Sequence, residues 1–114
     1  MRVKVRGSRP EKDLALIEFK AHLSKMQFEW DAAKAAANLA KHGVDFAQAT
    51  AVFTDPAHLT ITDARHTAEH RENTTGLVQG HLLTITHTAR AGVTRLISAR
   101  LASRPERKHY HAAR

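Results

Sequence analysis

A tight turn between two strand patterns is the sequence feature that most constrains the fold. Residues 82–90 and 93–101 are rich in β-branched and apolar side chains, and only Ala91 and Gly92 separate them. A connection this short joins neighbouring antiparallel strands. Simple alternation puts Thr88 opposite Arg95, on the face that also carries Thr84, Thr86 and Arg90. The other face then carries Leu83, Ile85, His87, Leu96, Ser98 and Arg100.

Two helices are predicted ahead of these strands. Residues 32–41 are rich in alanine, follow Asp31 as an N-terminal cap and end before Gly43, which suits a C-terminal cap. A second helix begins at Asp45, which has capping-box spacing to Gln48, and ends before residues 55–56, Asp-Pro. Its apolar face is made by Phe46, Ala49 and Phe53.

Two further strands and one more helix complete the predicted order. Strand patterns cover residues 58–63 and about 71–78, and a loop at Gly80 follows them. A last helix covers about residues 102–111, where Pro105 fits only the first turn. Two N-terminal helices, a four-stranded antiparallel sheet and a C-terminal helix predict an α+β fold, with the sheet packed on helices.

The size and composition of the chain narrow its class. With 114 residues it has room for one domain, and it contains no cysteine for a disulfide or a thiolate-bound zinc. The basic N-terminus is followed by no continuous apolar stretch of the kind that a secretion signal or a membrane span requires. We therefore expect a cytoplasmic protein that does not enter a membrane.

Positive charge is concentrated near the C-terminus. The formal net charge is +7, and residues 90–114 hold seven Lys and Arg against the single acid Glu106. Residues 26–89 hold four against seven acids, and residues 1–25 hold seven against three. A basic C-terminal region is the electrostatic footprint expected of a protein that binds a polyanion. A solvated basic helix end explains the same charges without a ligand.

Two segments carry a family resemblance. The first reads Phe28-Glu29-Trp30-Asp31-x-x-Lys34-x-x-x-Asn38-x-x-Lys41-His42-Gly43-Val44-x-Phe46. The second runs from Arg95-Leu96-Ile97-Ser98-Ala99-Arg100 into Ser103-Arg104-Pro105-Glu106-Arg107-Lys108-His109-Tyr110. Together with Phe53, Asp55-Pro56, Asp63, Glu69-x-Arg71, Gly76 and Thr88-x-Arg90, they resemble the BrnT family of small ribonuclease toxins from bacterial type II toxin–antitoxin pairs.

The resemblance covers about residues 26–110 and implies a RelE-like fold, so we expect the toxin domain to be residues 26–114. Residues 1–25 fall outside it, and two interpretations stay open for them. They form a short added helix, because Leu14, Ile17 and Ala21 share a helical face, or they are an extension ahead of a natural start at Met26.

Metal-independent RNA cleavage, which the resemblance implies, requires cations at the phosphate, a base and an acid. Arginine suits the first task because its donors match phosphate oxygens, so Arg95 and Arg100 are the leading catalytic candidates. Simple alternation separates them, so either a bulge realigns them or Arg100 reaches round from the strand end. In another interpretation, one of the two only ties the sheet to the last helix.

The remaining catalytic candidates are Glu69, Arg71 and His42. Glu69 and Arg71 are two residues apart, so on a strand they form either a base and a phosphate clamp or a simple ion pair. Lys41 and His42 close the first helix, where cations also complement the helix dipole. The resemblance retains this Lys-His-Gly run, so His42 is an acid or base candidate and Lys41 an RNA-binding one.

Three more residues are expected to bind RNA, namely Arg90, Ser98 and Tyr110. Tyr110 can stack on a base or donate a proton, although a core aromatic at the end of the last helix explains it equally well. Position 87 is His where relatives commonly have an aromatic residue, so no stacking role is carried over to that strand.

The run His66-Thr67-Ala68-Glu69-His70 matches the H-x-x-E-H pattern of inverted zinc peptidases. It lies between two predicted strands rather than on a helix, and no third ligand is evident, so we expect neither a metal site nor a cofactor.

The expected partners follow from the resemblance. They are RNA and a BrnA-type antitoxin with a ribbon-helix-helix part, in a hetero-oligomer that binds operator DNA. The alternative function is a toxin-like RNA-binding or co-repressor module without catalysis. The RNA target, any dependence on the ribosome and the stoichiometry of the complex cannot be predicted from the sequence.

Overall fold

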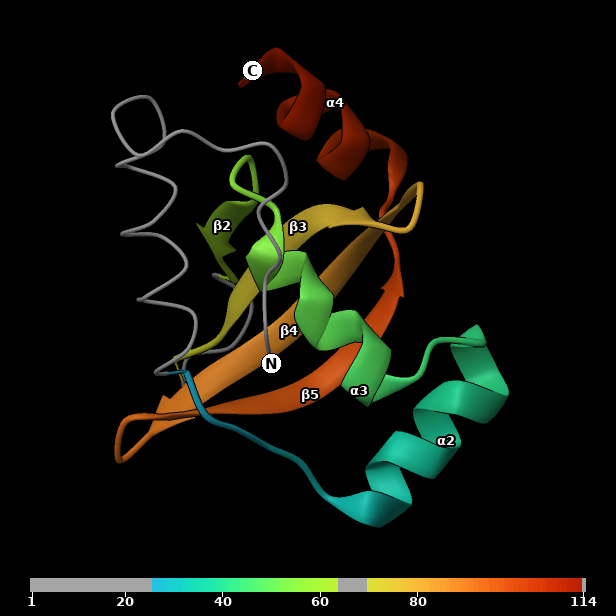
Figure 1. Cartoon of the computed structure of the whole chain (residues 1–114), viewed down its shortest axis with the longest axis vertical. Helices are drawn as coiled ribbons and strands as arrows, with labels where there is room; N and C mark the ends of the chain where they lie inside the picture. The colour runs from blue at the N-terminus through green and yellow to red at the C-terminus, as the bar shows by residue number, and fades with distance from the viewer. Residues whose placement is uncertain (1–25, 64–69, 114) are drawn as a thin grey trace, which may run out of the picture.

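The computed structural model describes residues 26–63 and 70–113. The helices are α2 (Ala32–His42), α3 (Phe46–Ala49) and α4 (Arg104–Ala112), with a 3₁₀ segment η1 (Thr50–Thr54) directly after α3. The strands are β1 (Phe28–Glu29), β2 (Leu59–Thr62), β3 (Glu72–Val78), β4 (His81–Arg90) and β5 (Val93–Leu101). They form one sheet in the order β1-β5-β4-β3-β2. Figure 1 shows α3 in front of this sheet and α4 near the chain's C-terminus.

The sheet is mixed rather than purely antiparallel. The α+β class and the four predicted strands are confirmed, but the chain does not begin with two helices, since strand β1 precedes α2, and the prediction of a four-stranded antiparallel sheet is wrong. A fifth strand, β1, pairs in parallel with β5 through Phe28 opposite Thr94 and Glu29 opposite Arg95. Two residues show no alternation, and their partners are more than 60 positions away, so no local pattern predicts this pairing.

The first helix has the predicted ends. The Asp31 side chain accepts a hydrogen bond from the Lys34 N–H at the N-terminus of α2, and Gly43 closes the helix with a φ of 70°. The Asn38 side chain then fixes α2 against the sheet. Its amide nitrogen donates to the carbonyls of Val44 and Ala99, and its amide oxygen accepts the Ala99 N–H at 3.1 Å. One side chain thereby satisfies part of the outer edge of β5.

The second helix differs from its prediction. Only Phe46–Ala49 is α-helical, the chain continues as η1, and Asp45 makes no side-chain capping bond. The segment that changes from α-helix to 3₁₀ helix is also the one that packs closely on β3. A Cβ at Gly76 would lie 2.7 Å from the Val52 carbonyl oxygen, so β3 accepts η1 at this distance only because residue 76 is glycine.

The core lies between the helices and one face of the sheet. Its buried side chains come from α3, η1, β4 and β5, and they include Phe46, Ala49, Val52, Phe53, Ile85, Leu96 and Ala99. Phe28 and Trp30 seal the β1 side of this core through ring contacts with Phe53 and Phe46. Among the described residues, no helix is long and apolar enough to cross a membrane.

The β4–β5 hairpin turns where the sequence predicts. Ala91 and Gly92 have φ angles of 50° and 81°, the positive values that a two-residue hairpin turn requires, and Thr88 lies opposite Arg95. Farther along, the register shifts by one residue. His87 pairs with Leu96 but Thr86 pairs with Ser98, so Ile97 is the extra residue of a β-bulge.

This bulge changes the face on which two predicted site residues lie. Arg100 is opposite Thr84 and Ser98 is opposite Thr86, so both share a face with Arg95 and Thr88. The assignment of Ser98 and Arg100 to the core face is therefore wrong, and the alternative in which a bulge realigns the two arginines is confirmed.

Candidate functional site

The face of the sheet opposite the core is lined by hydroxyl, amide and guanidinium groups. We call it the polar sheet face and define it by Asn73, Thr75, Thr84, Thr86, Thr88, Arg95, Ser98 and Arg100. Side chains on adjacent strands bond across it. Thr86 donates to the Asn73 amide oxygen at 2.6 Å, and the hydroxyls of Thr75 and Thr84 are 2.7 Å apart. Such cross-strand bonds fix the side chains before any ligand binds.

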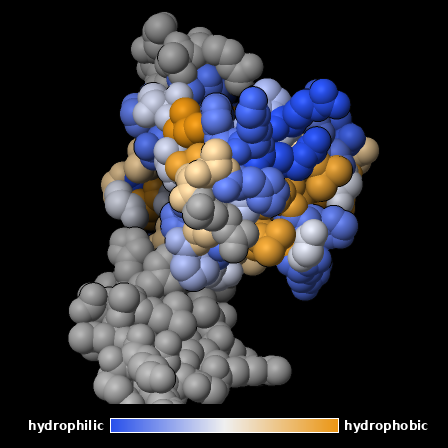
Figure 2. Space-filling view, turned by 90° about the horizontal axis from the view of Figure 1, so that it is seen from above, coloured by the Kyte–Doolittle hydropathy of each residue, from blue (hydrophilic) through white to orange (hydrophobic). Residues whose placement is uncertain are grey.

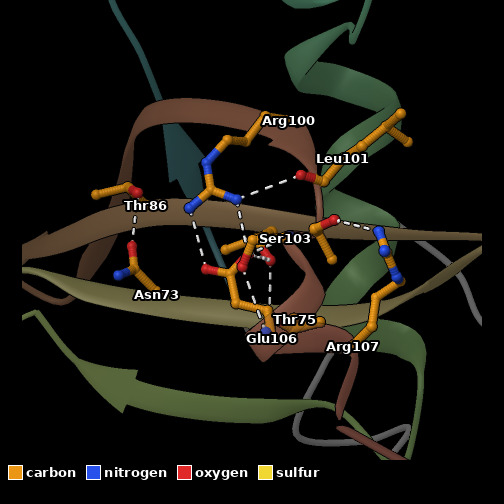
Figure 3. A network of polar contacts seen from close by, with 10 residues as sticks. Asn73, Thr75, Thr86, Arg100, Leu101, Ser103, Glu106 and Arg107 are labelled. Carbon is orange, nitrogen blue, oxygen red and sulfur yellow. Dashed lines mark hydrogen bonds and ion pairs between the residues drawn. The ribbon is translucent and has the colours of Figure 1, made fainter. Parts of the chain in front are cut away.

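Helix α4 covers one end of the polar sheet face through Glu106. Its carboxylate accepts hydrogen bonds from both terminal nitrogens of Arg100, at 2.7 and 3.0 Å, and from the Thr84 hydroxyl at 3.0 Å. Arg100 Nη1, one of these two nitrogens, also donates to the Leu101 carbonyl at 3.2 Å (Figure 3). This two-pronged pairing is the strongest common geometry between a guanidinium and a carboxylate. Arg100 thus ties the sheet to the last helix, as one of the interpretations of the sequence has it.

Glu106 also caps the helix that carries it. Its side chain accepts the Ser103 N–H at 2.7 Å while the Ser103 hydroxyl accepts the Glu106 N–H, which completes a capping box. Burial acts to raise the pKa of Glu106, but the bonds from Arg100, Ser103 and Thr84 outweigh it and lower the pKa from 4.5 to about 2. Glu106 is therefore a fixed carboxylate at neutral pH. Sequence reasoning missed it, although the Ser-x-x-Glu spacing was a readable signal.

Arg95 is held more loosely at the other end of the polar sheet face. One of its terminal nitrogens lies 3.1 Å from a carboxylate oxygen of Glu29 on β1. The Arg95 side chain is 28% exposed and that of Glu29 is 41% exposed. An ion pair this open to solvent contributes about 0–1 kcal/mol, so it gives way easily to another anion.

Lys41 and His42 lie beside Ser98 rather than on the sheet. Both are exposed at the end of α2, where they line a groove between α2 and β5 with a volume of about 230 Å³. We call it the α2–β5 groove. Ser98 and the bulge residue Ile97 form its strand side, so the groove opens where the polar sheet face ends. His42 also lines a second cavity of about 310 Å³ with Val78, His81 and Leu101.

The other predicted site residues are dispersed. Arg90 is exposed at the hairpin end of β4, Arg71 is half-buried directly before β3, and Glu69 lies outside the described residues. Tyr110 is buried, with 1% exposure, and its hydroxyl donates to the Asp55 carboxylate. The stacking role predicted for Tyr110 is corrected to a core position, because its ring has no open face. The structure thus brings together Arg95, Ser98 and Arg100, with Lys41 and His42 next to them.

His87 lies on the core face, where alternation along the strand predicts it, and it is buried. His87 Nε2 lies 2.7 Å from the Thr74 hydroxyl, which is in turn 2.7 Å from the Thr60 hydroxyl. The ring of Phe53 packs on His87 edge-on. Burial lowers the pKa of His87 below 6.5, with His58 adding to the shift and Glu72 opposing it. The hydrogen bonds that link His87 to Thr74 and Thr74 to Thr60 satisfy the buried ring, so a histidine is tolerated in the core here.

The surface around α4 is strongly hydrophilic. Arg104, Arg107 and Lys108 are exposed on α4, and Arg107 also donates to the Ala102 carbonyl. Figure 2, seen from above the view of Figure 1, shows hydrophilic residues over much of the described surface with smaller hydrophobic areas between them. Within residues 26–63 and 70–113, no three His, Asp or Glu side chains are grouped to hold a metal ion. The His66–His70 run falls mostly outside those ranges.

A protein-family profile matches most of the chain. A profile of the ribonuclease toxin BrnT of type II toxin–antitoxin systems matches residues 30–106. The matched segment includes α2, the whole β4–β5 hairpin and Glu106, whereas Tyr110 lies beyond it. No curated protein matches the chain.

Proposed function

Because the chain belongs to the BrnT family of ribonuclease toxins of type II toxin–antitoxin systems, we propose that its polar sheet face binds and cuts RNA without a metal ion. The observation that supports this most is the bulge at Ile97, which puts Arg95, Ser98 and Arg100 on one face. Two guanidiniums and the half-buried hydroxyls of Thr86 and Ser98 on adjacent strands suit a phosphate and a ribose.

The two arginines take different roles in this proposal. Arg95 leaves its weak pairing with Glu29 and binds the scissile phosphate, where it stabilises the charge that builds in the transition state. Arg100 keeps its bonds to Glu106 and holds the end of the face in place, while the exposed 31% of its side chain adds positive potential. Arg95 is therefore the group whose loss removes a direct transition-state contact.

Proton transfer in this reaction needs one group to accept and one to donate. The ribose 2′-hydroxyl loses its proton as its oxygen attacks the adjacent phosphorus, and the 5′-oxygen leaves with a proton. On the described part of the chain, His42 is our candidate for the acid or the base, since it lines the α2–β5 groove beside Ser98. From the segment before β3, Glu69, which is outside the described residues, is the candidate base, and Arg71 is the candidate phosphate clamp.

The test is RNA cleavage by purified variants in the presence of EDTA. We expect Arg95→Ala to lower the rate about 10²- to 10³-fold, the usual cost of removing one transition-state donor. Lys108→Ala, a change of the same charge on the exposed part of α4, serves as the matched control. Full activity of Arg95→Ala, or loss of wild-type activity in EDTA, would falsify the proposal.

A partner of stated type belongs to the same proposal. We expect a BrnA-type antitoxin, whose ribbon-helix-helix part binds operator DNA in the complex and whose remaining segment covers the polar sheet face. A gene for such a protein next to the toxin gene, and a stable complex of the two products, would support this pairing.

One observation favours a second function. Both terminal nitrogens of Arg100 are directed at Glu106, and Tyr110 is buried, so two of the residues expected to act on RNA are engaged within the fold. This arrangement suits a module that binds RNA or acts as a co-repressor without cleavage. Intact RNA after incubation with a wild-type chain that binds it tightly would favour this alternative.

A further inference from the structure

The α2–β5 groove has the chemistry of a nucleotide-binding subsite. Two lysines, Lys34 and Lys41, line it together with His42, and none of its seven lining residues is acidic. Lys34 and Lys41 are seven residues apart on α2, which is two helical turns, so they share a face of the helix. No ion pair joins either lysine to an acid of the described chain, so both are available to an anion.

The groove also has apolar lining residues, Ala37 on α2 and the bulge residue Ile97 on β5. They give a ribose or a base an apolar contact beside the lysines. Its volume of about 230 Å³ is below the roughly 300–1,000 Å³ of typical small-molecule sites, so we assign it a single nucleotide, part of which stays outside the groove. Asn38, which bonds to Ala99 on β5, keeps the two walls at a fixed separation.

Ser98 connects this groove to the polar sheet face. It lies opposite Thr86 on that face and lines the groove as well, so the two surfaces are continuous across the β5 edge. An RNA strand whose scissile phosphate lies at Arg95 reaches the groove at Ser98, which lies on β5 between the β1 pairing at Arg95 and the Asn38 bonds at Ala99. The bulge brings the two surfaces together, because Ile97, the residue left out of the strand pairing, lines the groove beside Ser98.

We propose that the α2–β5 groove binds the nucleotide of the RNA strand that flanks the scissile phosphate, with Lys34 and Lys41 at its phosphate and Ala37 and Ile97 against its sugar or base. This inference takes RNA as the substrate from the proposed function, and it adds the direction in which the RNA strand crosses the sheet. The RNA crosses β5 towards α2, and the exposed basic residues of α4 are not on its path.

The experiment measures binding without cleavage. The probe is a fluorescent hexanucleotide with 2′-O-methyl groups at every position, which the proposed chemistry cannot cut, titrated with the full chain at several salt concentrations. For Lys34→Ala/Lys41→Ala we expect Kd to rise at least about tenfold, and the slope of log Kd against log salt to fall by about 0.7 for the one phosphate that the two lysines share.

Two further variants make the result specific to the groove. Arg104→Ala/Lys108→Ala removes the same charge from α4, and we expect it to keep Kd within about threefold of the wild type. Ala37→Leu fills the groove without changing charge, so it should weaken binding while leaving the salt slope unchanged. Neither change replaces a buried side chain, so folding is expected to be retained.

The outcomes separate this inference from the proposed function. Wild-type affinity in the lysine variant, or an equal loss in the α4 variant, overturns the groove assignment. If the wild type binds the probe but leaves unmodified RNA intact, the cleavage proposal fails and the groove is still decided by the variants. If the wild type does not bind the probe at all, both are overturned.

Discussion

Arg95 and Arg100 share a face of the sheet but differ in how firmly they are held. Glu29, the partner of Arg95, is 41% exposed, whereas Glu106, the partner of Arg100, is 18% exposed and bonded to three other groups. The same residue type therefore serves as an exchangeable phosphate ligand at one position and as a structural anchor at the other. Mutating the two positions should affect activity and stability in different proportions.

Replacement of Glu106 by glutamine tests the anchor. It leaves Arg100 without its charged partner, and hydrogen bonds to charged groups are worth about 1.5–3 kcal/mol, so we expect a loss of about 2 kcal/mol in unfolding free energy. Chemical denaturation measures it. Glu29→Gln, which removes an exposed pair, should change stability by no more than about 1 kcal/mol. Equal effects of the two variants would contradict the anchor role.

The same residue predicts an acid dependence of stability. The pKa of Glu106 is about 2 in the folded chain against 4.5 as its ordinary value, so the folded state releases this proton more readily. Its contribution to stability is fully present above pH 4.5 and is lost as pH falls towards 2. Denaturation curves of the wild type and Glu106→Gln should therefore converge over this range. Parallel curves down to pH 2 would count against the assignment.

His87 predicts a second pH effect at a higher range. Its pKa is lowered by burial, with Glu72 opposing and His58 adding to the shift, so the unfolded chain binds a proton where the folded chain does not. Stability is thus complete above pH 6.5 and declines below it as the buried ring is forced to take up a charge. Nuclear magnetic resonance titration of the ring gives the direct measurement. A His87 pKa above 6.5 would show that the ring is not desolvated.

At the scale of elements, Asn38 decides where α2 lies. The helix has an exposed, alanine-rich outer surface, and Asn38 is its buried residue, with bonds to Ala99 in β5 and to Val44 beyond the helix end. On the outer edge of β5, β1 pairs with Thr94 and Arg95, and this amide bonds to Ala99 farther along the strand. The side chain substitutes for a neighbouring strand where the sheet has none.

Asn38→Ala should therefore be among the most damaging single changes. It leaves the N–H and C=O of Ala99 and the carbonyl of Val44 without this partner, and we expect a loss of about 3 kcal/mol in unfolding free energy. Leu39→Ala, at an exposed position of the same helix, should cost about 0.5 kcal/mol or less. Thermal unfolding of the two variants makes the comparison, and similar melting temperatures would refute the role of Asn38.

The elements that sequence predicted are those set by neighbouring residues. Asp31 and Gly43 define α2, and Ala91-Gly92 defines the hairpin, because caps and tight turns depend on a few adjacent side chains. The strand β1 and the bulge at Ile97 depend on partners in other elements, which alternation along one strand cannot reveal. The candidate site followed the same division. Its residue types were predicted, but their shared face and the role of Glu106 required the structure.

For the described part of the molecule, the Lys and Arg side chains of residues 90–113 are divided among three places. Arg95 and Arg100 lie on the polar sheet face, Arg90 at the hairpin end, and Arg104, Arg107 and Lys108 on α4. A partner that covers the polar sheet face thus meets basic groups on both sides of it. This distribution favours an acidic or amphipathic segment and speeds its encounter.

Antitoxin binding and RNA cleavage should therefore exclude one another. We expect titration with the neighbouring gene's product to abolish cleavage at one equivalent, and its association to slow with salt, since screening acts over about 8 Å at physiological ionic strength. A cleavage assay at two salt concentrations, with stopped-flow association in parallel, measures both effects. A tight complex that still cuts RNA at the free rate would place the antitoxin elsewhere.

Residues 26–114 should fold without the segment ahead of them. The described residues hold a core cluster of their own and the bond from Tyr110 on α4 to Asp55, and the family match begins at residue 30. We expect a chain that starts at Met26 to keep its melting temperature within a few degrees and to keep RNA cleavage. Insolubility of this chain, or a large drop in melting temperature, would show that residues 1–25 contribute to the core.

The bulge at Ile97 affects how relatives of this chain can be found by sequence. Arg95 and Arg100 are five positions apart, yet they present the surface of a pair four apart, because one residue between them is left out of the pairing. A relative that has lost that residue would have an unbroken strand and the same two guanidiniums on the same side. Search patterns for this surface should therefore allow one gap between the arginines, and an alignment that forbids it would separate proteins with equivalent faces.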